Sequence, residues 1–404
     1  AGTMPEDYLP ELKAILGTAL QRSPDVVARE VERLAYEARV DIANSARLPQ
    51  VGGNFNYGTT ETATASNTNA RTRDDGFFYN FGVSQALFHW GALKNQTAAA
   101  RLSLLVHDRS YALAYRELSV MLRKAYLGLI AEKAAVREGR ETLRLVERDV
   151  AVAHAKMESG SISTAALEGE KLRLREAGLV FDRLRENFTV NCRRFGRLAG
   201  LPAWSEDQVP AEIPAPKYSE SLTTAMAATL LRDNAKSTLE YEIYDLKIRE
   251  AVYRQKIEAV RLFPKFDANA AYNLENTTNV DGNAVAQRAV TRQAISIAGS
   301  WRIFDGFATR GAKREALAAK RVLEHRLASD LDQLLQTAQT LERALKLDAE
   351  QLALGEIRHG MAIEGRRRIA EEVGFGNRPK GEIERAELGV LQAETKNLEA
   401  RAAF

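Results

Sequence analysis

The most informative pattern in the sequence is a strict alternation of apolar and polar positions, which recurs in four segments. Successive side chains of a β-strand point to opposite faces, so this alternation predicts strands with one apolar and one polar face. We predict four strands, over residues 50–64, 75–89, 264–276 and 290–304, with turn-rich stretches at 59–75 and 276–283. The apolar faces carry large side chains, among them Phe55, Tyr57, Phe77, Tyr79, Phe81, Tyr272, Ile295, Ile297 and Trp301.

The length of these segments distinguishes them from the strands of a soluble sandwich, which average about 5–6 residues. Alternation over about ten residues, with aromatic side chains near the ends, is typical of transmembrane β-barrels. We therefore expect the apolar faces to contact lipid and the polar faces, rich in Asn, Ser and Gly, to line a wet lumen. Four strands cannot close a barrel, and an open edge is not stable in lipid, so the chain must oligomerise. Two copies would give about eight strands and a lumen filled by side chains, whereas three would give about twelve and a usable pore.

Long helical patterns follow each pair of strands. Residues 91–159 and 306–373 predict helices of about 100 Å each, and residues 165–199 and 380–402 predict shorter helices that return. Apolar residues in the long helices are spaced as in a coiled coil, for example Leu327, Leu331, Leu334, Ala338, Leu341 and Leu345. Helical patterns also precede the strands, over residues 8–49 with a break at Ser23-Pro24, and without a break over 218–262.

The second half of the chain repeats the first at an offset of about 215 residues. We therefore divide the chain into a first repeat (residues 1–205), a proline-rich linker (206–216) and a second repeat (217–404). The fold class is mainly α with membrane β: long coiled-coil helices plus a four-stranded sector of a trimeric twelve-stranded β-barrel.

Composition excludes several functions. The 57 basic and 54 acidic side chains are mixed along the chain, which argues against a nucleic-acid partner. The single cysteine, Cys192, excludes an internal disulfide, and no catalytic, cofactor or metal-binding constellation is found, so we predict no enzyme. No apolar run reaches the roughly 18–20 residues of a membrane-spanning helix. We expect that a signal peptide has been removed, although a cytosolic protein is the alternative from composition alone.

The turns between the long and returning helices are the candidate contact sites. We expect Gly160 and Gly374 to end their helices in the left-handed conformation. Just before the second turn lies a dense set of charges, which is either a solvated helix end or a ring at the entrance of a tunnel. This set consists of Arg366, Arg367, Arg368, Glu371 and Glu372.

Taken in order, these landmarks resemble the TolC family of outer-membrane efflux and secretion channels across essentially the whole chain. The resemblance is carried by Ser23-Pro24, by residues 46–51 (Ala-Arg-Leu-Pro-Gln-Val), by residues 85–88 (Gln-Ala-Leu-Phe) leading to Gly91, and by Phe304-Asp305-Gly306. It implies a homotrimer in the outer membrane of a Gram-negative bacterium, with a helical tunnel extending into the periplasm. It also implies that the turns, at Gly160, Ser161, Gly374 and Gly376, contact a periplasmic adaptor (membrane fusion) protein, which connects the channel to an inner-membrane pump of the RND or ABC type.

Three functions remain open at this point. The first is a passive outer-membrane exit duct of a tripartite efflux machine, and the second uses the same fold for type I export of a polypeptide or for polysaccharide export. The third is a soluble coiled-coil scaffold. The sequence departs from the family in lacking the lipidated N-terminal cysteine of many members and in the Gly- and Pro-rich second turn.

Overall fold

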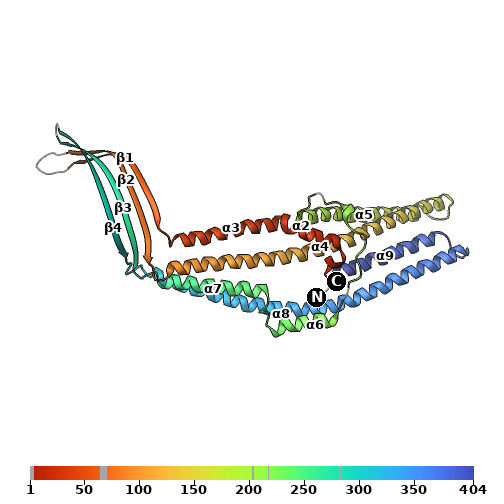
Figure 1. Cartoon of the computed structure of the whole chain (residues 1–404). Coiled ribbons are helices and arrows are strands. Elements are labelled where there is room, and N and C mark those ends of the chain that lie inside the picture. The colour runs from red at the N-terminus through yellow and green to blue at the C-terminus, as the bar shows by residue number, and fades with distance from the viewer. Residues whose placement is uncertain (1–3, 64–70, 203, 217, 282–283) are drawn as a thin grey trace. The chain divides into compact units, whose positions relative to one another are not determined.

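The computed structural model describes residues 4–63, 71–202, 204–216, 218–281 and 284–404 (Figure 1). The chain forms two compact units, each assembled from distant parts of the sequence. Unit 1 comprises Ala1–Glu30, Tyr111–Thr238 and Asp330–Phe404, and unit 2 comprises Val31–Ser110 and Leu239–Ser329. In the part of the chain that the structure describes, no helix is long and apolar enough to cross a membrane.

Unit 2 contains one antiparallel sheet of strands β1 (Gln50–Ala63), β2 (Arg71–Phe88), β3 (Lys265–Asp281) and β4 (Ala284–Ser300), in that order. The register aligns the predicted apolar positions across the sheet, with Phe55 opposite Tyr79 and Phe81 opposite Tyr272. The four predicted strands and their alternation are confirmed.

Three of the four strands are longer at the turns than predicted. β2 begins at Arg71, β3 continues to Asp281 and β4 begins at Ala284, because backbone pairing between two strands does not require apolar side chains. Residues 64–70 and 282–283, which fall in the predicted turns, lie outside the described residues. At the other end β4 stops at Ser300, so the prediction that Trp301 belongs to the strand is wrong. Its indole N–H instead donates to the carbonyl oxygen of Leu262 at 3.1 Å.

Both strand pairs connect to a long helix through the same kind of turn. Trp90 and Gly91 have φ values of 54° and 79°, and Gly306 and Phe307 have values of 63° and 69°. Residues in the left-handed region cannot continue a strand, so neither β2 nor β4 extends beyond this turn. The long helices α4 (Ala92–Glu158) and α8 (Ala308–Gly374) start immediately afterwards, each with 67 residues.

Small buried residues lie on the helices of unit 2. Ala43 of helix α3 (Pro24–Ser45) and Ala99 of α4 are buried, and Thr97 of α4 donates to the Ala43 carbonyl oxygen at 3.2 Å. Helix α7 (Leu239–Ala259) adds the buried Ala251. These helices and the first turns of α8 line a groove of about 680 Å³.

The predicted continuous helix over residues 218–262 is wrong. It is divided into α6 (Glu220–Arg232) and α7, and the intervening residues Asn234 and Ala235 have φ values of 50° and 55°. A left-handed residue cannot continue a right-handed helix, so the chain must break there.

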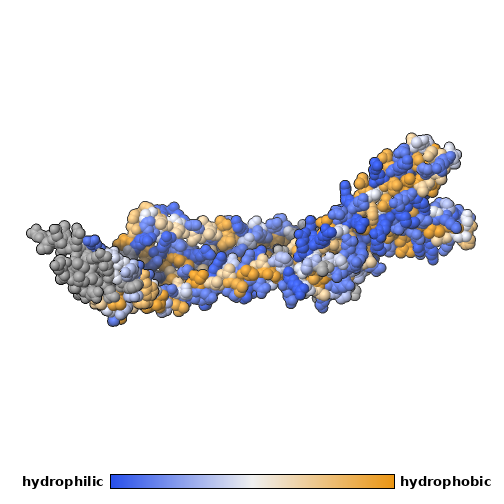
Figure 2. Space-filling model, turned by 90° about the horizontal axis from the view of Figure 1, so that it is seen from above, coloured by the Kyte–Doolittle hydropathy of each residue, from blue (hydrophilic) through white to orange (hydrophobic). Residues whose placement is uncertain are grey.

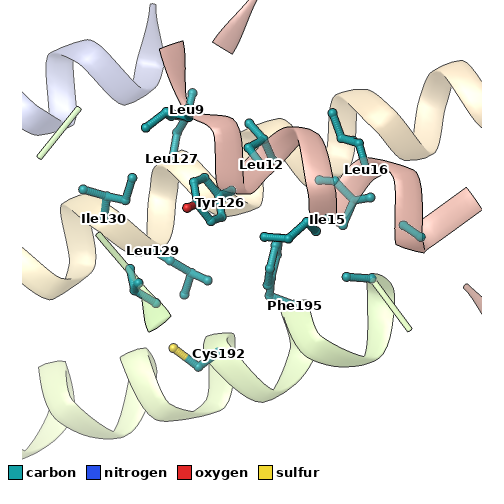
Figure 3. Packing of buried hydrophobic residues seen from close by; sticks show 14 of the residues in the cluster. Leu9, Leu12, Ile15, Leu16, Tyr126, Leu127, Leu129, Ile130, Cys192 and Phe195 are labelled. Atoms are coloured by element: carbon teal, nitrogen blue, oxygen red, sulfur yellow. The ribbon is translucent and has the colours of Figure 1, made fainter. Parts of the chain in front are cut away.

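Unit 1 has the principal hydrophobic core of the chain (Figure 3). Its short helices α1 (Pro5–Tyr8) and α2 (Pro10–Arg22) cover the middle of α4 and the end of α5 (Thr164–Leu198). Leu12, Tyr126 and Phe195 meet at the centre, each at most 1% exposed. The remaining helices are a single 3-10 turn (Glu206–Gln208) and α9 (Gly381–Ala403), which contributes Leu398 to the core.

Candidate functional site

One face of the sheet is apolar and uncovered. The exposed fractions are 62% for Phe55, 77% for Tyr57, 92% for Ile295 and 73% for Ile297. Phe81 and Tyr272 of the same face are also exposed, and Tyr79 is partly buried, with its ring centroid 5.7 Å from that of Phe55. Phe77 pairs with Tyr57 in the register, while its side chain lies outside the described set. An exposed apolar surface of this extent indicates a site of contact with a membrane, another protein or a ligand.

The two outer strands of this sheet have one neighbour each. Within the described residues, β1 pairs only with β2 and β4 only with β3. Each outer strand therefore presents a row of backbone N–H and C=O groups along its free edge. Such an edge pairs readily with another strand.

The opposite face of the sheet is polar, and it contains residues that our sequence reasoning did not single out. At one level of the sheet Asn54, Asn80, Asn273 and Arg292 stand side by side in the register, one from each strand. Asn80 donates a hydrogen bond to the Oδ1 atom of Asn273. A single Asn in an alternating strand does not indicate a functional site, and the alignment of these residues becomes visible only when the strand register is known.

Both helix turns have the hydrogen bonds of a Schellman motif. At the first, Gly160 N–H donates to Met157 O at 2.9 Å and Ser161 N–H to Lys156 O at 2.8 Å. Gly160 has a φ of 73°, which confirms the left-handed conformation predicted for it.

The second turn repeats this geometry two residues later than predicted. Gly376 N–H donates to Val373 O at 3.0 Å, Asn377 N–H donates to Glu372 O at 2.9 Å, and Gly376 has a φ of 78°. Gly374 is the last residue of α8, so its predicted left-handed conformation is wrong. Phe375, between these two glycines, is 80% exposed.

The structure does not bring the five predicted entrance charges together as one cluster. Arg367 pairs with Glu364 one turn earlier at 2.9 Å, and Arg366 reaches Glu387 of α9 at 3.8 Å. Glu372 pairs with Arg378 in the turn. Arg368 and Glu371 make no ion pair among the described side chains.

The denser ion pairs of unit 1 connect α4 to α9, and our sequence reasoning missed them. Glu384 accepts from Arg144 at 3.1 Å and from Arg148 at 2.5 Å. Arg385 reaches Asp149 at 3.3 Å, which extends the same contact. Arg137 and Glu394, at 3.1 Å, form a further link nearer the core. These links join the α4–α5 hairpin to the α8–α9 hairpin within unit 1.

The helices leading to the turns also carry exposed apolar side chains among the charged ones (Figure 2). On α8 these residues are spaced by three, four or seven, as on one side of a helix. They are Leu347, Leu354, Ile357 and Met361, between 53% and 70% exposed. On α5 Leu172 and Leu179 are 60% and 65% exposed. These surfaces are suited to packing against other helices.

Two ionisable groups of unit 1 are affected by burial: Glu132 is partly buried, and Cys192 lies within the core. Burial raises the pKa of the Glu132 carboxyl, although Asn191 donates to its Oε1 atom at 2.7 Å, and its Oε2 atom is buried without a hydrogen bond. Burial also raises the pKa of the Cys192 thiol to about 11. A thiol with a raised pKa is a poor nucleophile at neutral pH. Among the described residues, no three His, Cys, Asp or Glu side chains gather as a metal site would require.

Comparison with known proteins relates this arrangement to a family. Residues 15–177 match the family described as outer membrane efflux protein. No curated protein matches the sequence significantly.

Three solved structures share the fold over nearly the whole chain. The outer membrane protein VceC from Vibrio cholerae is 14% identical, with a TM-score of 0.72 over 100% of this chain and 96% of that one. The CmeC outer membrane channel of Campylobacter jejuni is 13% identical, with a TM-score of 0.76 over 100% and 86%. The MtrE outer membrane channel of Neisseria gonorrhoeae is 14% identical, with a TM-score of 0.69 over 97% and 86%. The chain as a whole therefore has the fold of these outer membrane proteins, and residues 15–177 resemble the outer membrane efflux protein family in sequence.

Proposed function

We propose that this chain forms the outer-membrane exit duct of a tripartite export machine, as a homotrimer with a twelve-stranded barrel. The observation that carries the proposal is the four-stranded sheet, which has one exposed apolar face and two free edges. The apolar face, from Phe55 to Ile297, suits contact with outer-membrane lipid. Free edges are not tolerated in lipid, so β4 of one copy pairs with β1 of the next.

The number of copies follows from what the lumen must do. A barrel of about eight strands is filled by its own side chains, so two copies would leave no duct. Three copies give about twelve strands and an open lumen lined by the polar face. The exposed apolar stripes on α5 and α8 then pack between neighbouring copies as coiled-coil seams.

The helix turns are the proposed contact with a periplasmic adaptor protein, which connects the duct to an inner-membrane pump of the RND or ABC type. Support comes from the exposed ends at Gly160, Ser161, Gly374 and Gly376, with the uncovered ring of Phe375 between the last two. Because the duct itself has no energy source, it conducts passively from the periplasmic end to the cell exterior.

The adaptor contact is tested at the two left-handed glycines. Gly160→Val and Gly376→Val each strain the turn by roughly 1 kcal/mol or more, because a β-branched residue is disfavoured at positive φ. We expect export to fall in cells while trimer assembly is unchanged. Gly374→Ala is the matched control, since Gly374 is helical and a Cβ there meets no atom within 4 Å. Normal export in both valine variants, at normal expression, would contradict adaptor contact at the turns.

A second proposed role is control of the periplasmic entrance by Arg366, Arg367, Arg368, Glu371 and Glu372, repeated in every copy. Exposed ion pairs contribute only about 0–1 kcal/mol each, but a repeated set adds up across the assembly. Replacing the three arginines with Ser should loosen the entrance and raise single-channel conductance at low salt. A variant that conducts like the parent would assign these residues to a solvated helix end.

Fractionation and conductance test the proposal as a whole. We expect the protein in the outer-membrane fraction, extracted only by detergent, and discrete conductance steps when the purified protein is added to planar bilayers. A folded protein recovered from the soluble fraction without detergent would contradict the duct and favour a soluble scaffold.

A further inference from the structure

The polar rung of the sheet, defined as Asn54, Asn80, Asn273 and Arg292, is the most specific chemical feature on the polar face. The backbone register pairs Asn54 with Asn80, Asn80 with Asn273, and Asn273 with Arg292. The rung therefore crosses the whole sheet at one level. With Asn80 donating to the oxygen of Asn273, the Nδ2 group of Asn273 keeps its two N–H donors.

A cavity of about 240 Å³ lies over this rung and is lined by all four of its residues. The next rung on the same face consists only of small residues, namely Gly52, Gly82, Ala271 and Ala294. Because no side chain there is longer than a methyl group, the amides and the guanidinium are accessible from that side. Asn56, Phe78 and Val290 line the other side.

The two rungs on the helical side of the polar rung carry no charge. They are the rung of small residues and the one beyond it, which consists of Gln50, Ser84, Asn269 and Ser296. Towards the strand turns the same face carries charged positions of both signs, namely Asp74, Glu275, Asp281 and Arg288. Arg292 is exposed and always protonated. At the helical end of the same face Asp267 is engaged with His89 at 2.9 Å, and Lys265 lies at the start of β3. Glu275 follows Asn273 on the same face of β3, opposite Val290.

Guanidinium and amide N–H groups together bind the oxygens of carboxylates, phosphates and sulfonates, and Arg does so through two parallel hydrogen bonds. Rings of Arg or Lys side chains favour anions in pores. We infer that the rung of Asn54, Asn80, Asn273 and Arg292 forms an anion-attracting ring in the barrel, so that the duct is anion-selective and favours cargo with carboxylate, phosphate or sulfonate groups. This inference rests on the proposed channel function, because a ring requires the closed barrel.

The test is a charge series at one position, measured as the chloride-to-potassium permeability ratio of single channels under a KCl gradient at low salt. We expect the parent to have a ratio above one and Arg292→Lys to retain it. In Arg292→Gln the ratio should fall about twofold, because each subunit loses one positive charge that lies about a Debye length from the pore axis. Arg292→Glu should reverse the preference. Raising the salt concentration to about 1 M should lower the permeability ratio of the parent towards that of Arg292→Gln, because the Debye length falls to about 3 Å and the charge is screened.

Lys265→Gln is the matched control, since it removes one positive charge from the same face at a different level. Its effect on the permeability ratio should be clearly smaller than that of Arg292→Gln. Equal effects of the two substitutions would overturn the inference in favour of a diffuse lumen charge, and so would a cation preference in the parent. Channels of normal conductance with unchanged selectivity across the Arg292 series would refute the ring alone. Membrane-inserted protein without any conductance would refute the channel function and the ring with it.

Discussion

Glu384 is the residue through which α9 is held most directly against α4. Its Oε2 atom lies 3.1 Å from Arg144 and 2.5 Å from Arg148, and its side chain is 34% exposed. The substitution Glu384→Gln removes the charge and keeps the shape of the side chain. It should therefore weaken the docking of the α8–α9 hairpin on α4 without disturbing the core, which lies at other positions.

The size of the effect follows from the geometry. A partly exposed ion pair contributes about 0–1 kcal/mol, and a carboxylate shared by two guanidinium groups at short distance belongs at the upper end of that range. The loss of both pairs amounts to about 1–2 kcal/mol, which includes the repulsion left between the two arginines. This corresponds to a change of about tenfold in the population of the undocked hairpin.

Amide hydrogen exchange measures this population directly, because exchange at the start of α9 requires local opening. For the assembled protein in detergent at low salt, we expect the amides near Glu384 to exchange about tenfold faster in Glu384→Gln than in the parent. Salt of about 1 M should accelerate exchange in the parent and leave the variant nearly unchanged.

Glu382→Gln is the matched control on the same helix. Glu382 pairs with Arg378 inside the turn, at 2.8 Å, and so should not affect docking on α4. Equal protection of α9 in the parent and in Glu384→Gln would refute the assignment of these ion pairs as the link between the hairpins.

Two further predictions concern stability. Gly200 has a φ of 68°, and a Cβ there would lie 2.6 Å from the backbone of Arg22, so Gly200→Ala should lower the free energy of unfolding by about 2–4 kcal/mol in denaturant titrations. Gly178→Ala, in an open part of α5, should instead raise it by about 0.5–1 kcal/mol, and a reversed order would contradict the packing of this turn. Because burial raises the pKa of Glu132 above its unfolded value, ionisation of its carboxylate costs stability as the pH rises through the folded pKa. The free energy of unfolding of Glu132→Gln should therefore rise relative to that of the parent as the pH increases from the ordinary pKa of a glutamate to the raised pKa of Glu132. A difference that is independent of pH would argue against a buried carboxylate.

The elements that the sequence predicted well are those defined by a local period. Alternation with period two marked all four strands, and helical periodicity marked α4, α5, α8 and α9 within a few residues. The errors arose where the backbone does not follow side-chain polarity. Polar residues such as those at 276–281 suggest a turn, yet β3 continues through them because the ladder is made by backbone groups.

The local sequence pattern could not predict the backbone conformation of single residues or the contacts between distant residues. The break between α6 and α7 depends on Asn234 and Ala235 adopting positive φ, and alanine gives no sequence signal for that conformation. The choice of Gly376 over Gly374 depends on where α8 stops, since both glycines satisfy the same local pattern. The pairing of Arg144 with Glu384 joins positions 240 residues apart and requires the register between two packed helices.

The closure of four-stranded sectors into a trimeric barrel is tested most directly by native mass spectrometry of the protein extracted from outer membranes with detergent. In a second sample, cysteines are introduced along β1 and β4 to test whether these edges pair by disulfide cross-linking. The native Cys192 is buried and does not compete for cross-linking. We predict an assembly of three times the mass of one chain, and disulfide cross-links between β1 of one copy and β4 of the next. A detergent-extracted particle containing one or two copies, or cysteines on these edges that never cross-link, would contradict the barrel.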